Sequence, residues 1–355
     1  MVYVIAEAGV NHNGQRDMAF ALVDAAAEAG ADAVKFQTFD AEKLASTAVS
    51  KAAYQVSSTG EAGGQREMLK KLELPRNWHA ELRSHALAKG MDFMSTAFDV
   101  DSLHFLVELG VPMIKVPSGE LTNGPLLWQY ARAGKPLVLS TGMATLSDVE
   151  QALGIVCHAL HSDGEPASTD EIWHSWSNAA YRASLKGRVT LLHCTTQYPT
   201  AAGEVNLAAM DTLAQAFGLP VGYSDHTEGI TASLAAVARG AVLIEKHFTL
   251  DRNLPGPDHA ASLEPGELVT MVREIRAIEQ MIGDGVKGPQ ASEWDSRRAG
   301  RQQVVAARGI ARGAILVRED LTTARCGEGL PPTELWNLVG TAAAHDFAAG
   351  EVFRR

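Results

Sequence analysis

Short hydrophobic runs alternate with longer amphipathic segments along most of the chain. Mostly apolar runs with the length and flanking residues of β-strands occur at residues 2–6, 33–36, 92–95, 113–116, 137–139, 189–192, 220–223 and 242–245. Stretches with Ala, Leu and charged residues at helical spacing separate most of them, such as 18–29, 78–89, 147–160 and 264–282. Alternating strands and helices predict a parallel sheet, and eight such strands favour an α/β fold of the (β/α)8 TIM-barrel type over an open doubly wound sheet.

Two long segments interrupt this alternation. Residues 39–75 form a polar stretch after the second strand, on the side where barrel enzymes carry their active sites, and we interpret it as a candidate lid. Residues 162–186, with Trp173 and Trp176, precede the sixth strand on the opposite side, where a structural or interfacial role is expected.

The end of the chain differs in character from the rest. A Gly-rich stretch from Gly283 to Pro289 breaks regular structure. We therefore divide the chain into a barrel domain (1–283), a linker (284–295) and a small C-terminal domain (296–355). Short strands are expected in the last domain at 304–306 and 315–317.

Composition narrows the class of protein. Of the 355 residues, 46% are hydrophobic, enough for a large core, and the formal net charge of −11 argues against a nucleic-acid partner. The three cysteines are widely spread, which is typical of reduced thiols in a cytosolic protein. The chain enters a strand directly at Val2, and no apolar run approaches the ~18 residues of a membrane helix. We expect a cytoplasmic protein without a membrane partner.

Two histidines follow the seventh and eighth predicted strands. His226 and His247 would emerge at the same edge of a parallel sheet if these strands are neighbours. Two neutral imidazoles in one crevice can bind a divalent ion and leave positions open for water or a substrate oxygen. The alternative is that both are ordinary strand-end histidines, one of which caps the following helix.

Other polar residues lie at or just after the C-terminal ends of the predicted strands. They are Glu7, Asn11, His12, Lys35, Gln37, Ser95, Thr96, Lys115, Ser118, Glu120, Ser140, Thr141, Thr195, Thr196, Tyr198, Ser224, Asp225 and Lys246. Lysines that end buried strands are costly unless an anion or a carboxylate meets them, so Lys35 and Lys115 are candidate anion ligands. A metal, an anion pocket and the Glu120 carboxylate at one mouth indicate activation of a carbonyl group. An aldolase that forms a lysine imine is the rival enzyme class.

Several motifs resemble the sialic acid (N-acetylneuraminate) synthase family, including its legionaminate synthases. They are Glu7-Ala-Gly-Val-Asn-His-Asn-Gly14, Val34-Lys-Phe-Gln-Thr38, Ser95-Thr-Ala-Phe98, Lys115-Val-Pro-Ser-Gly-Glu120, Ser140-Thr-Gly-Met143, His193-Cys-Thr-Thr-Gln-Tyr-Pro199, Tyr223-Ser-Asp-His-Thr227, Glu245-Lys-His-Phe-Thr249 and Gly256-Pro-Asp258. The tail, with Arg308-Gly-Ile-Ala-Arg-Gly313, is similar to the family's antifreeze-like (SAF) domain. The resemblance spans almost the whole chain.

This resemblance implies a metal-dependent condensation of phosphoenolpyruvate with N-acetylmannosamine that releases phosphate. His226 and His247 would bind Mn²⁺ or Mg²⁺. Phosphoenolpyruvate would contact Lys35, Thr96, Lys115, Ser118, Thr196 and Ser224. The sugar would face Glu120, Tyr198, Asp258 and Arg325, the last from the partner subunit of a domain-swapped homodimer. Glu120 and Glu7 are the expected catalytic carboxylates, with Glu120 placed to handle the acceptor's proton.

The chain departs from the family pattern near the sugar. Thr196 stands where relatives carry Asn or Thr, Ala324-Arg-Cys326 replaces a Lys-Arg-Pro segment, and Thr200-Ala-Ala-Gly203 replaces a Pro-containing turn. A 2,4-diacetamido-trideoxy-hexose, the acceptor of legionaminate synthases, is therefore an alternative to N-acetylmannosamine. From a different class, the antifreeze-like tail leaves a non-enzymatic ice-binding protein as an alternative.

Overall fold

A computed structural model describes residues 1–45, 56 and 64–354 of the chain. These residues form two compact units, Met1–Gly283 and Asp284–Arg355. Much of the segment interpreted as a lid lies outside the described residues. Its described parts include the short helices α2 (Ala41–Leu44) and α4 (Gln65–Leu72).

The first unit is built on one eight-stranded parallel sheet, in the order β3-β2-β1-β8-β7-β6-β5-β4. The strands are β1 (Tyr3–Gly9), β2 (Ala33–Thr38), β3 (Asp92–Ala97), β4 (Ile114–Val116), β5 (Leu137–Ser140), β6 (Val189–Cys194), β7 (Val221–Asp225) and β8 (Leu243–His247). The two end strands of this order, β3 and β4, lie next to each other. The sheet therefore curves into a nearly closed barrel, and the predicted fold class is confirmed.

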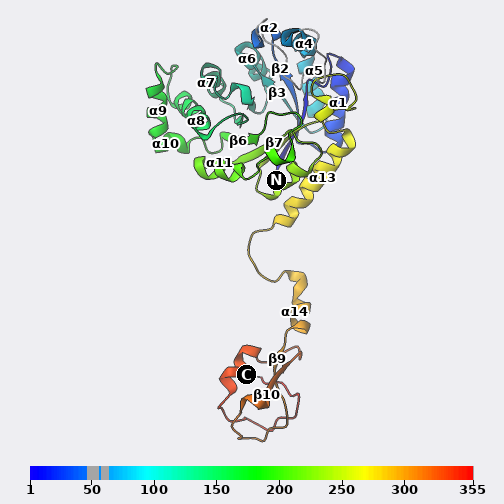
Figure 1. The fold of residues 1–355 in the computed structure, drawn as a ribbon, viewed down its shortest axis with the longest axis vertical. Helices are drawn as coiled ribbons and strands as arrows, with labels where there is room; N and C mark the ends of the chain where they lie inside the picture. The colour runs from blue at the N-terminus through cyan, green and yellow to red at the C-terminus, as the bar shows by residue number, and fades with distance from the viewer. Residues whose placement is uncertain (46–55, 57–63, 355) are drawn as a thin grey trace. The chain divides into compact units, whose positions relative to one another are not determined.

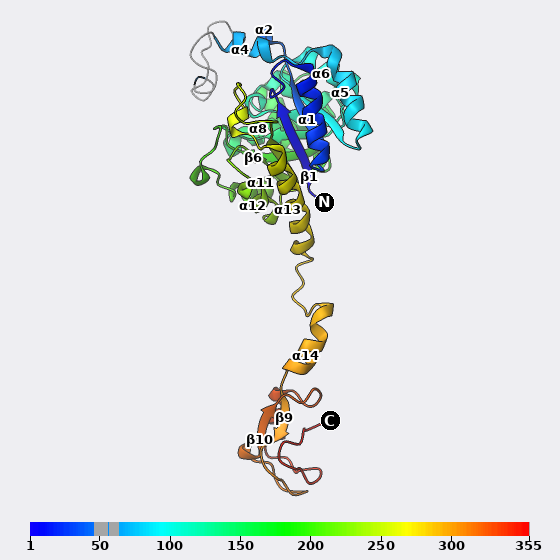
Figure 2. The ribbon, with the colours of Figure 1, turned by 90° about the vertical axis from the view of Figure 1, so that its right-hand side faces the viewer.

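Helices surround the strands, as Figures 1 and 2 show. They include α1 (Arg16–Glu28), α5 (Arg76–Ala88), α6 (Val100–Leu109), α7 (Gly124–Arg132), α8 (Leu146–His161), α11 (Ala209–Phe217), α12 (Thr231–Ala238) and α13 (Pro265–Ile282). Local sequence sets their ends. Thr145 and Asp148 form a capping box at the start of α8. The turns that follow α1, α5 and α12 use Gly30, Gly90 and Gly240 at positive φ, where glycine carries no Cβ penalty.

Most strands run further than their hydrophobic cores. β1 continues to Gly9 instead of ending at residue 6, and β8 continues to His247 instead of ending at residue 245. The added residues include Glu7 and His247, which are buried although they are polar. The hydrophobic pattern ends early because the inner face of the barrel mouth is polar, and these residues still take part in the backbone ladder.

Two of the apolar clusters of the first unit lie around and inside the sheet. The larger one fills the space between the strands and the surrounding helices. The smaller one lies inside the barrel and consists of Ile5, Ala33, Met94, Val138, Leu192 and Leu243. Gly222 of β7 faces this layer closely, because a Cβ added there would lie 2.7 Å from Leu192 Cδ2 and 2.4 Å from the Leu243 carbonyl oxygen. The interior is thus packed below the mouth.

The insertion before β6 folds into two short helices, α9 (Thr169–Ser177) and α10 (Ala179–Ala183). They pack on α8, where Ile172 is buried and Trp176 donates a hydrogen bond to Glu150 of α8 (2.8 Å). The insertion therefore extends the outer helical layer.

The C-terminal unit has its own small core around Val304, Leu321 and Phe347. Its ladder joins β9 (Gln303–Ala306) to β10 (Leu321–Ala324) in antiparallel order, and α14 (Trp294–Gly300) precedes them. The strand expected at 315–317 is wrong, since Ile315 makes only an isolated bridge with Ala342. That apolar run lies in a turn-rich segment. Its backbone hydrogen bonds are made with a later turn, for example from the Leu316 amide to the Thr341 carbonyl oxygen. Across the described residues, the helices are too short or too polar to span a membrane.

Candidate active site

The candidate site lies on the inner face of the barrel at the carboxyl ends of the strands. Side chains alternate along a strand, so the residue two positions after one in the inner apolar layer faces inward as well. On β1 this places Glu7 above Ile5, and on β8 it places Glu245 above Leu243. Other buried polar residues of the layer include Lys35, Thr96, Lys115, Ser140, Ser224 and His247.

Two lysines and two carboxylates form one buried ion network in this layer. Lys35 Nζ lies 2.7 Å from Glu7 Oε2 and 3.4 Å from Glu245 Oε2. Lys115 Nζ lies 3.4 Å from Glu245 Oε1. Each lysine side chain is at most 5% exposed. A buried ammonium group needs a charged partner, and these carboxylates supply it. Lys35 also donates a hydrogen bond to Thr96 Oγ1 (2.9 Å), which joins that predicted residue to the network.

Burial and charge act in opposite directions on these groups. Burial alone would raise the pKa of Glu245, but Lys115 and Lys35 and a hydrogen bond from Ser224 (2.8 Å) hold it well below its usual range. Burial raises the pKa of Glu7 to about 7, and Lys35 limits that rise. Burial would lower the pKa of Lys35, but Glu245 and Glu7 more than compensate, so its pKa is raised. Lys35 is therefore an ammonium ion at neutral pH.

His226 and His247 come together beside this network, as the sequence predicts. Their ring centroids are 5.7 Å apart, and both side chains are buried. Nδ1 of His226 donates a hydrogen bond to the Thr195 carbonyl oxygen, so Nε2 is the nitrogen that carries the lone pair, and it lies 3.3 Å from Ser224 Oγ. Among the described residues, Nδ1 of His247 has no hydrogen-bond partner.

Both imidazoles are held in the neutral form. Burial lowers the pKa of His226 to about 4, although the Thr195 carbonyl opposes the shift. Burial, with the neighbouring His226 and Lys35, lowers the pKa of His247 well below its usual range. Neutral imidazole is the form that binds metals. A buried ring nitrogen without a partner and a second lone pair fit a divalent ion.

Two loops bring further predicted residues to the histidines. The Tyr198 ring lies 4.2 Å from the His226 ring between centroids, and its hydroxyl is 3.2 Å from His226 Nε2. Asp258 Oδ2 is 3.9 Å from His247 Nδ1, and burial raises the pKa of this carboxyl to about 6. The Asp258 loop is tied down by Ser262, whose hydroxyl donates to the Asp258 carbonyl (2.7 Å) and accepts from Asn11 (3.0 Å).

Ser118 and Thr196 converge on Gly142 from different strands. The Gly142 amide donates to Ser118 Oγ (3.1 Å), and Ser118 Oγ lies 3.2 Å from Cys194 Sγ. A Cβ on Gly142 would lie 2.7 Å from Ser118 Oγ and 2.8 Å from Thr196 Cγ2. Only glycine leaves room for both side chains at this point.

Glu120 and Arg325, two of the predicted site residues, are not among the described members of the buried ion network. Glu120 ends the short helix η1 (Ser118–Glu120) and accepts a hydrogen bond from Asn123 of its own loop (2.7 Å). Arg325 belongs to the C-terminal unit, where it is exposed immediately after β10. Its proposed contribution to a barrel stays a prediction.

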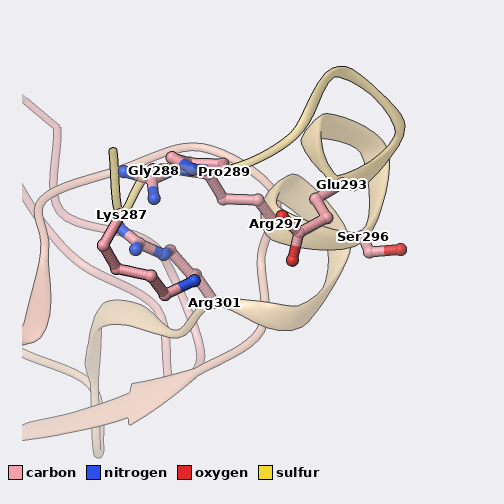
Figure 3. Close-up of a pocket in the computed structure, with 7 residues that line it drawn as sticks. All are labelled: Lys287, Gly288, Pro289, Glu293, Ser296, Arg297 and Arg301. Carbon is pink, nitrogen blue, oxygen red and sulfur yellow. The ribbon is translucent and has the colours of Figure 1, made fainter. Parts of the chain in front are cut away.

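The C-terminal unit also contains an open pocket of about 490 Å³ at the linker and α14. Lys287, Arg297 and Arg301 line it with Glu293, Gly288, Pro289 and Ser296, as Figure 3 shows. The side chains of Lys287 in the linker, Arg297 on α14 and Arg301 just after α14 lie near one another. Arg297 lies over the Trp294 ring, 5.3 Å from its centroid. The described lining includes none of the predicted site residues.

Comparison with known families decides the identity of the chain. Residues 22–287 match the NeuB family, and residues 301–355 match the SAF domain. The chain belongs to the NeuB family.

Relatives of this NeuB protein cover nearly its whole length. It is 44% identical over 351 residues to N,N'-diacetyllegionaminic acid synthase of Campylobacter jejuni, covering 99% of this chain and 98% of that protein. It is 45% identical to the enzyme of the same name from Legionella pneumophila, covering 98% and 92%. It is 35% identical to human N-acetylneuraminate-9-phosphate synthase, covering 95% and 87%.

A solved NeuB-type structure agrees with the fold. The crystal structure of N-acetylneuraminic acid synthetase from Leptospira borgpetersenii, in complex with citrate, is 34% identical with a TM-score of 0.67. The match covers 83% of this chain and 90% of that one. The resemblance predicted from motifs is thereby confirmed.

The structure adds Glu245 to the site, which the sequence analysis did not name as a functional residue. Its carboxylate contacts both predicted anion-binding lysines and Ser224. The available signal was its position, since Glu245 lies two residues before His247 and so shares the inner face of β8.

Proposed function

We propose that this NeuB-family protein is a phosphoenolpyruvate-dependent nonulosonate synthase, a transferase that joins phosphoenolpyruvate to an acetamido sugar and releases phosphate. The observation that carries the proposal is the juxtaposition of the paired neutral histidines His226 and His247 with the Lys35 and Lys115 network at one barrel mouth. Relatives named as nonulosonate synthases over nearly the full chain support it.

The donor half of the site would use its positive charge and hydroxyl groups. Lys35 and Lys115 would bind the phosphate and carboxylate oxygens of phosphoenolpyruvate by charge-assisted hydrogen bonds. Thr96, Ser118, Thr196 and Ser224 would add neutral donors around the same anion. An anionic donor would bind close to the Glu245 carboxylate. The ammonium groups of Lys35 and Lys115 already pair with this carboxylate, and they would offset its repulsion of the donor.

The acceptor half would be organised by His226 and His247. Within the described residues no three His, Cys, Asp or Glu side chains converge as a metal site, so these two imidazoles would supply the protein ligands. A bound Mn²⁺ or Mg²⁺ would polarise the aldehyde oxygen of the open-chain sugar. Tyr198 and Asp258 lie against the histidines, where they would orient the sugar's hydroxyl and acetamido groups.

The proposed reaction runs in two steps. The C3 carbon of phosphoenolpyruvate would attack the aldehyde carbon, and the aldehyde oxygen would take up a proton as the C–C bond forms. We assign this proton to Glu120, as the sequence motifs imply. Water would then add to the cationic C2 centre and give up a proton that restores Glu120, and the bond between C2 and the phosphate oxygen would break. Phosphate leaves and a 2-keto acid remains.

The lysine-imine aldolase is disfavoured by the ion pairs. An amine must be unprotonated to attack a carbonyl, but the raised pKa of Lys35 keeps it charged. Borohydride treatment with pyruvate should therefore leave no reduced adduct on Lys35. An ice-binding role has no use for a buried network of charges at the barrel mouth.

Two acceptors fit this proposal. N-acetylmannosamine is the acceptor expected from the sequence motifs, while 44% identity to a diacetyllegionaminic acid synthase favours a 2,4-diacetamido-trideoxy-hexose. Phosphate release from phosphoenolpyruvate should be measured with both sugars and with N-acetylglucosamine as a stereochemical control. A kcat/KM at least tenfold higher for one sugar identifies the acceptor, and no release with any of them contradicts the proposal.

The assembly and location are also proposed. Arg325 would reach a neighbouring barrel in a domain-swapped homodimer, because its planar guanidinium suits the amide and hydroxyl oxygens of the sugar. Phosphoenolpyruvate is a cytoplasmic metabolite, so a cytoplasmic location is part of the proposal.

A further inference from the structure

A second buried ion pair lies directly behind the two histidines. Lys246 Nζ is 3.2 Å from Asp225 Oδ2, and both side chains are 0% exposed. Lys246 also donates to the Thr227 carbonyl oxygen (2.5 Å). Asp225 accepts hydrogen bonds from the Thr227 amide (2.8 Å) and from Ser233 Oγ of α12 (2.6 Å). The Lys246 ammonium group and both carboxylate oxygens of Asp225 therefore each have a polar partner.

The pair joins the two strands that carry the histidines. Asp225 and Lys246 are register partners at the ends of β7 and β8, and each immediately precedes one histidine. Since side chains alternate, Asp225 and Lys246 point to the helical layer while the histidines point into the barrel. Any slip of β7 along β8 would break the ion pair and move His226 relative to His247.

Stability alone is a poor explanation for the pair. Removing two charges from water costs about as much as their attraction returns, and apolar residues of similar volume commonly replace such pairs without loss of stability. Fixing a register is the role best attested for buried polar groups. The position of this pair, one residue from each histidine, gives the register a functional consequence.

We infer that Asp225 and Lys246 are positioning residues that hold His226 and His247 at one separation and thereby set the affinity of the site for a divalent ion. The inference rests on the proposed function, in which these histidines bind the metal. It concerns the ion-free protein as well, because the pair fixes the histidines before any ion binds.

The test compares metal affinity with fold stability in the full-length protein. The Asp225→Leu/Lys246→Met double variant removes both charges and keeps similar volume. After exhaustive chelation, the Mn²⁺ dissociation constant is measured by titration calorimetry and by electron paramagnetic resonance, and thermal unfolding is recorded. We expect a 10- to 100-fold weaker Mn²⁺ affinity, the usual effect of losing a supporting residue of a metal site, with a melting temperature close to that of the wild type.

A matched control separates a local effect from general damage. Asp32, which precedes β2, and Arg276 of α13 form another ion pair between two elements, with a distance of 2.6 Å. Asp32→Asn/Arg276→Gln should leave the Mn²⁺ dissociation constant within twofold of the wild type. A similar loss of affinity in this control would overturn the inference.

The remaining outcomes are distinct. If the wild type binds Mn²⁺ and the Asp225→Leu/Lys246→Met protein binds it within twofold, the positioning role is wrong and the proposed metal site stands. If the wild type binds no Mn²⁺, the metal assignment fails and this inference fails with it. Should the double variant not fold, Lys246→Arg keeps the charge while displacing it, and unchanged Mn²⁺ affinity in that protein overturns the inference.

Discussion

The ammonium group of Lys35 lies 2.7 Å from the carboxylate of Glu7, inside the barrel, with both side chains at most 3% exposed. This contact joins β2 to β1 at the carboxyl ends of the strands. Glu7 and Glu245 share this cation. Under the proposed function, phosphoenolpyruvate would bind to a charge arrangement that already exists in the free protein, and such preorganisation favours binding.

The two lysines should determine the affinity for the donor. Lys35→Ala and Lys115→Ala each remove a charge-assisted contact of roughly 1.5–3 kcal/mol, which corresponds to about a 10- to 150-fold higher KM for phosphoenolpyruvate. Steady-state kinetics with the donor and the sugar varied separately measure this. The control is Lys89→Ala, which removes an exposed ion pair with Asp24 (2.9 Å). If either site variant changed only the KM of the sugar, that lysine would be wrongly assigned.

Gly142 should be intolerant of a side chain. The added methyl of Gly142→Ala would lie 2.7 Å from Ser118 Oγ and 2.8 Å from Thr196 Cγ2, so one of these groups must move. We expect a KM for phosphoenolpyruvate at least tenfold higher and a nearly unchanged melting temperature. The control is Gly203→Ala, where an added Cβ has nothing within 4 Å. Wild-type kinetics in Gly142→Ala would show that Ser118 and Thr196 do not hold the donor.

Stability should fall at mildly acidic pH through buried histidines away from the site. Burial lowers the pKa of His79 to about 4, and its ring bridges the Thr38 hydroxyl (2.7 Å) and the Pro75 carbonyl (3.1 Å). The unfolded chain takes up this proton near pH 6.5, whereas the native chain does so only near pH 4. The stabilising contribution is therefore complete above pH 6.5 and is lost as the pH falls toward 4.

Unfolding in urea at pH 7.5 and pH 5.0 tests this linkage. One such histidine should lower the free energy of unfolding by about 2 kcal/mol over this interval, from roughly 1.4 kcal/mol per pH unit. His79→Gln should remove that part of the pH dependence, while His104→Gln, an exposed position on α6, serves as control. Equal pH dependence in the wild type and His79→Gln would contradict the assignment.

The hydrophobic pattern predicts the barrel because strand and helix cores are apolar. The pattern predicts ends for β1 and β8 that are too early, because Glu7 and His247 are polar although they face inward. At this end of the barrel the buried side chains are polar, as in the ion pair of Glu7 with Lys35. Strand ends also bring His226 and His247 together, since β7 and β8 are neighbours and alternation directs both inward. This part of the site follows from periodicity alone.

Loop geometry is the part that periodicity does not contain. The approach of Asp258 to His247 depends on hydrogen bonds from Asn11 to the Phe248 carbonyl and Ser262. Motif resemblance predicts Asp258, but the spacing between strands does not. In the C-terminal unit, the threonines of β10 are exposed or half-exposed, so this strand contains no apolar run. The hydrophobic pattern therefore predicts a strand at the apolar Ile315 segment, which makes only an isolated bridge.

The C-terminal unit should complete the active site of a neighbouring chain. Mixing two inactive proteins, Arg325→Ala and His247→Ala, and exchanging subunits should restore activity to up to about a quarter of the sites. Random exchange makes half the dimers mixed, and one site in each mixed dimer combines an intact barrel with an intact arginine. Verified heterodimers without activity would show that Arg325 serves its own barrel or none.

The most direct test of the proposed chemistry is phosphate release from phosphoenolpyruvate by the full-length protein, stripped of metal and then assayed with and without Mn²⁺ and with and without the acetamido sugar. We expect release only when both are present, and none above background in His247→Ala. Release without a sugar, or turnover that persists after complete removal of divalent ions, would contradict a metal-dependent condensation at the His226 and His247 mouth.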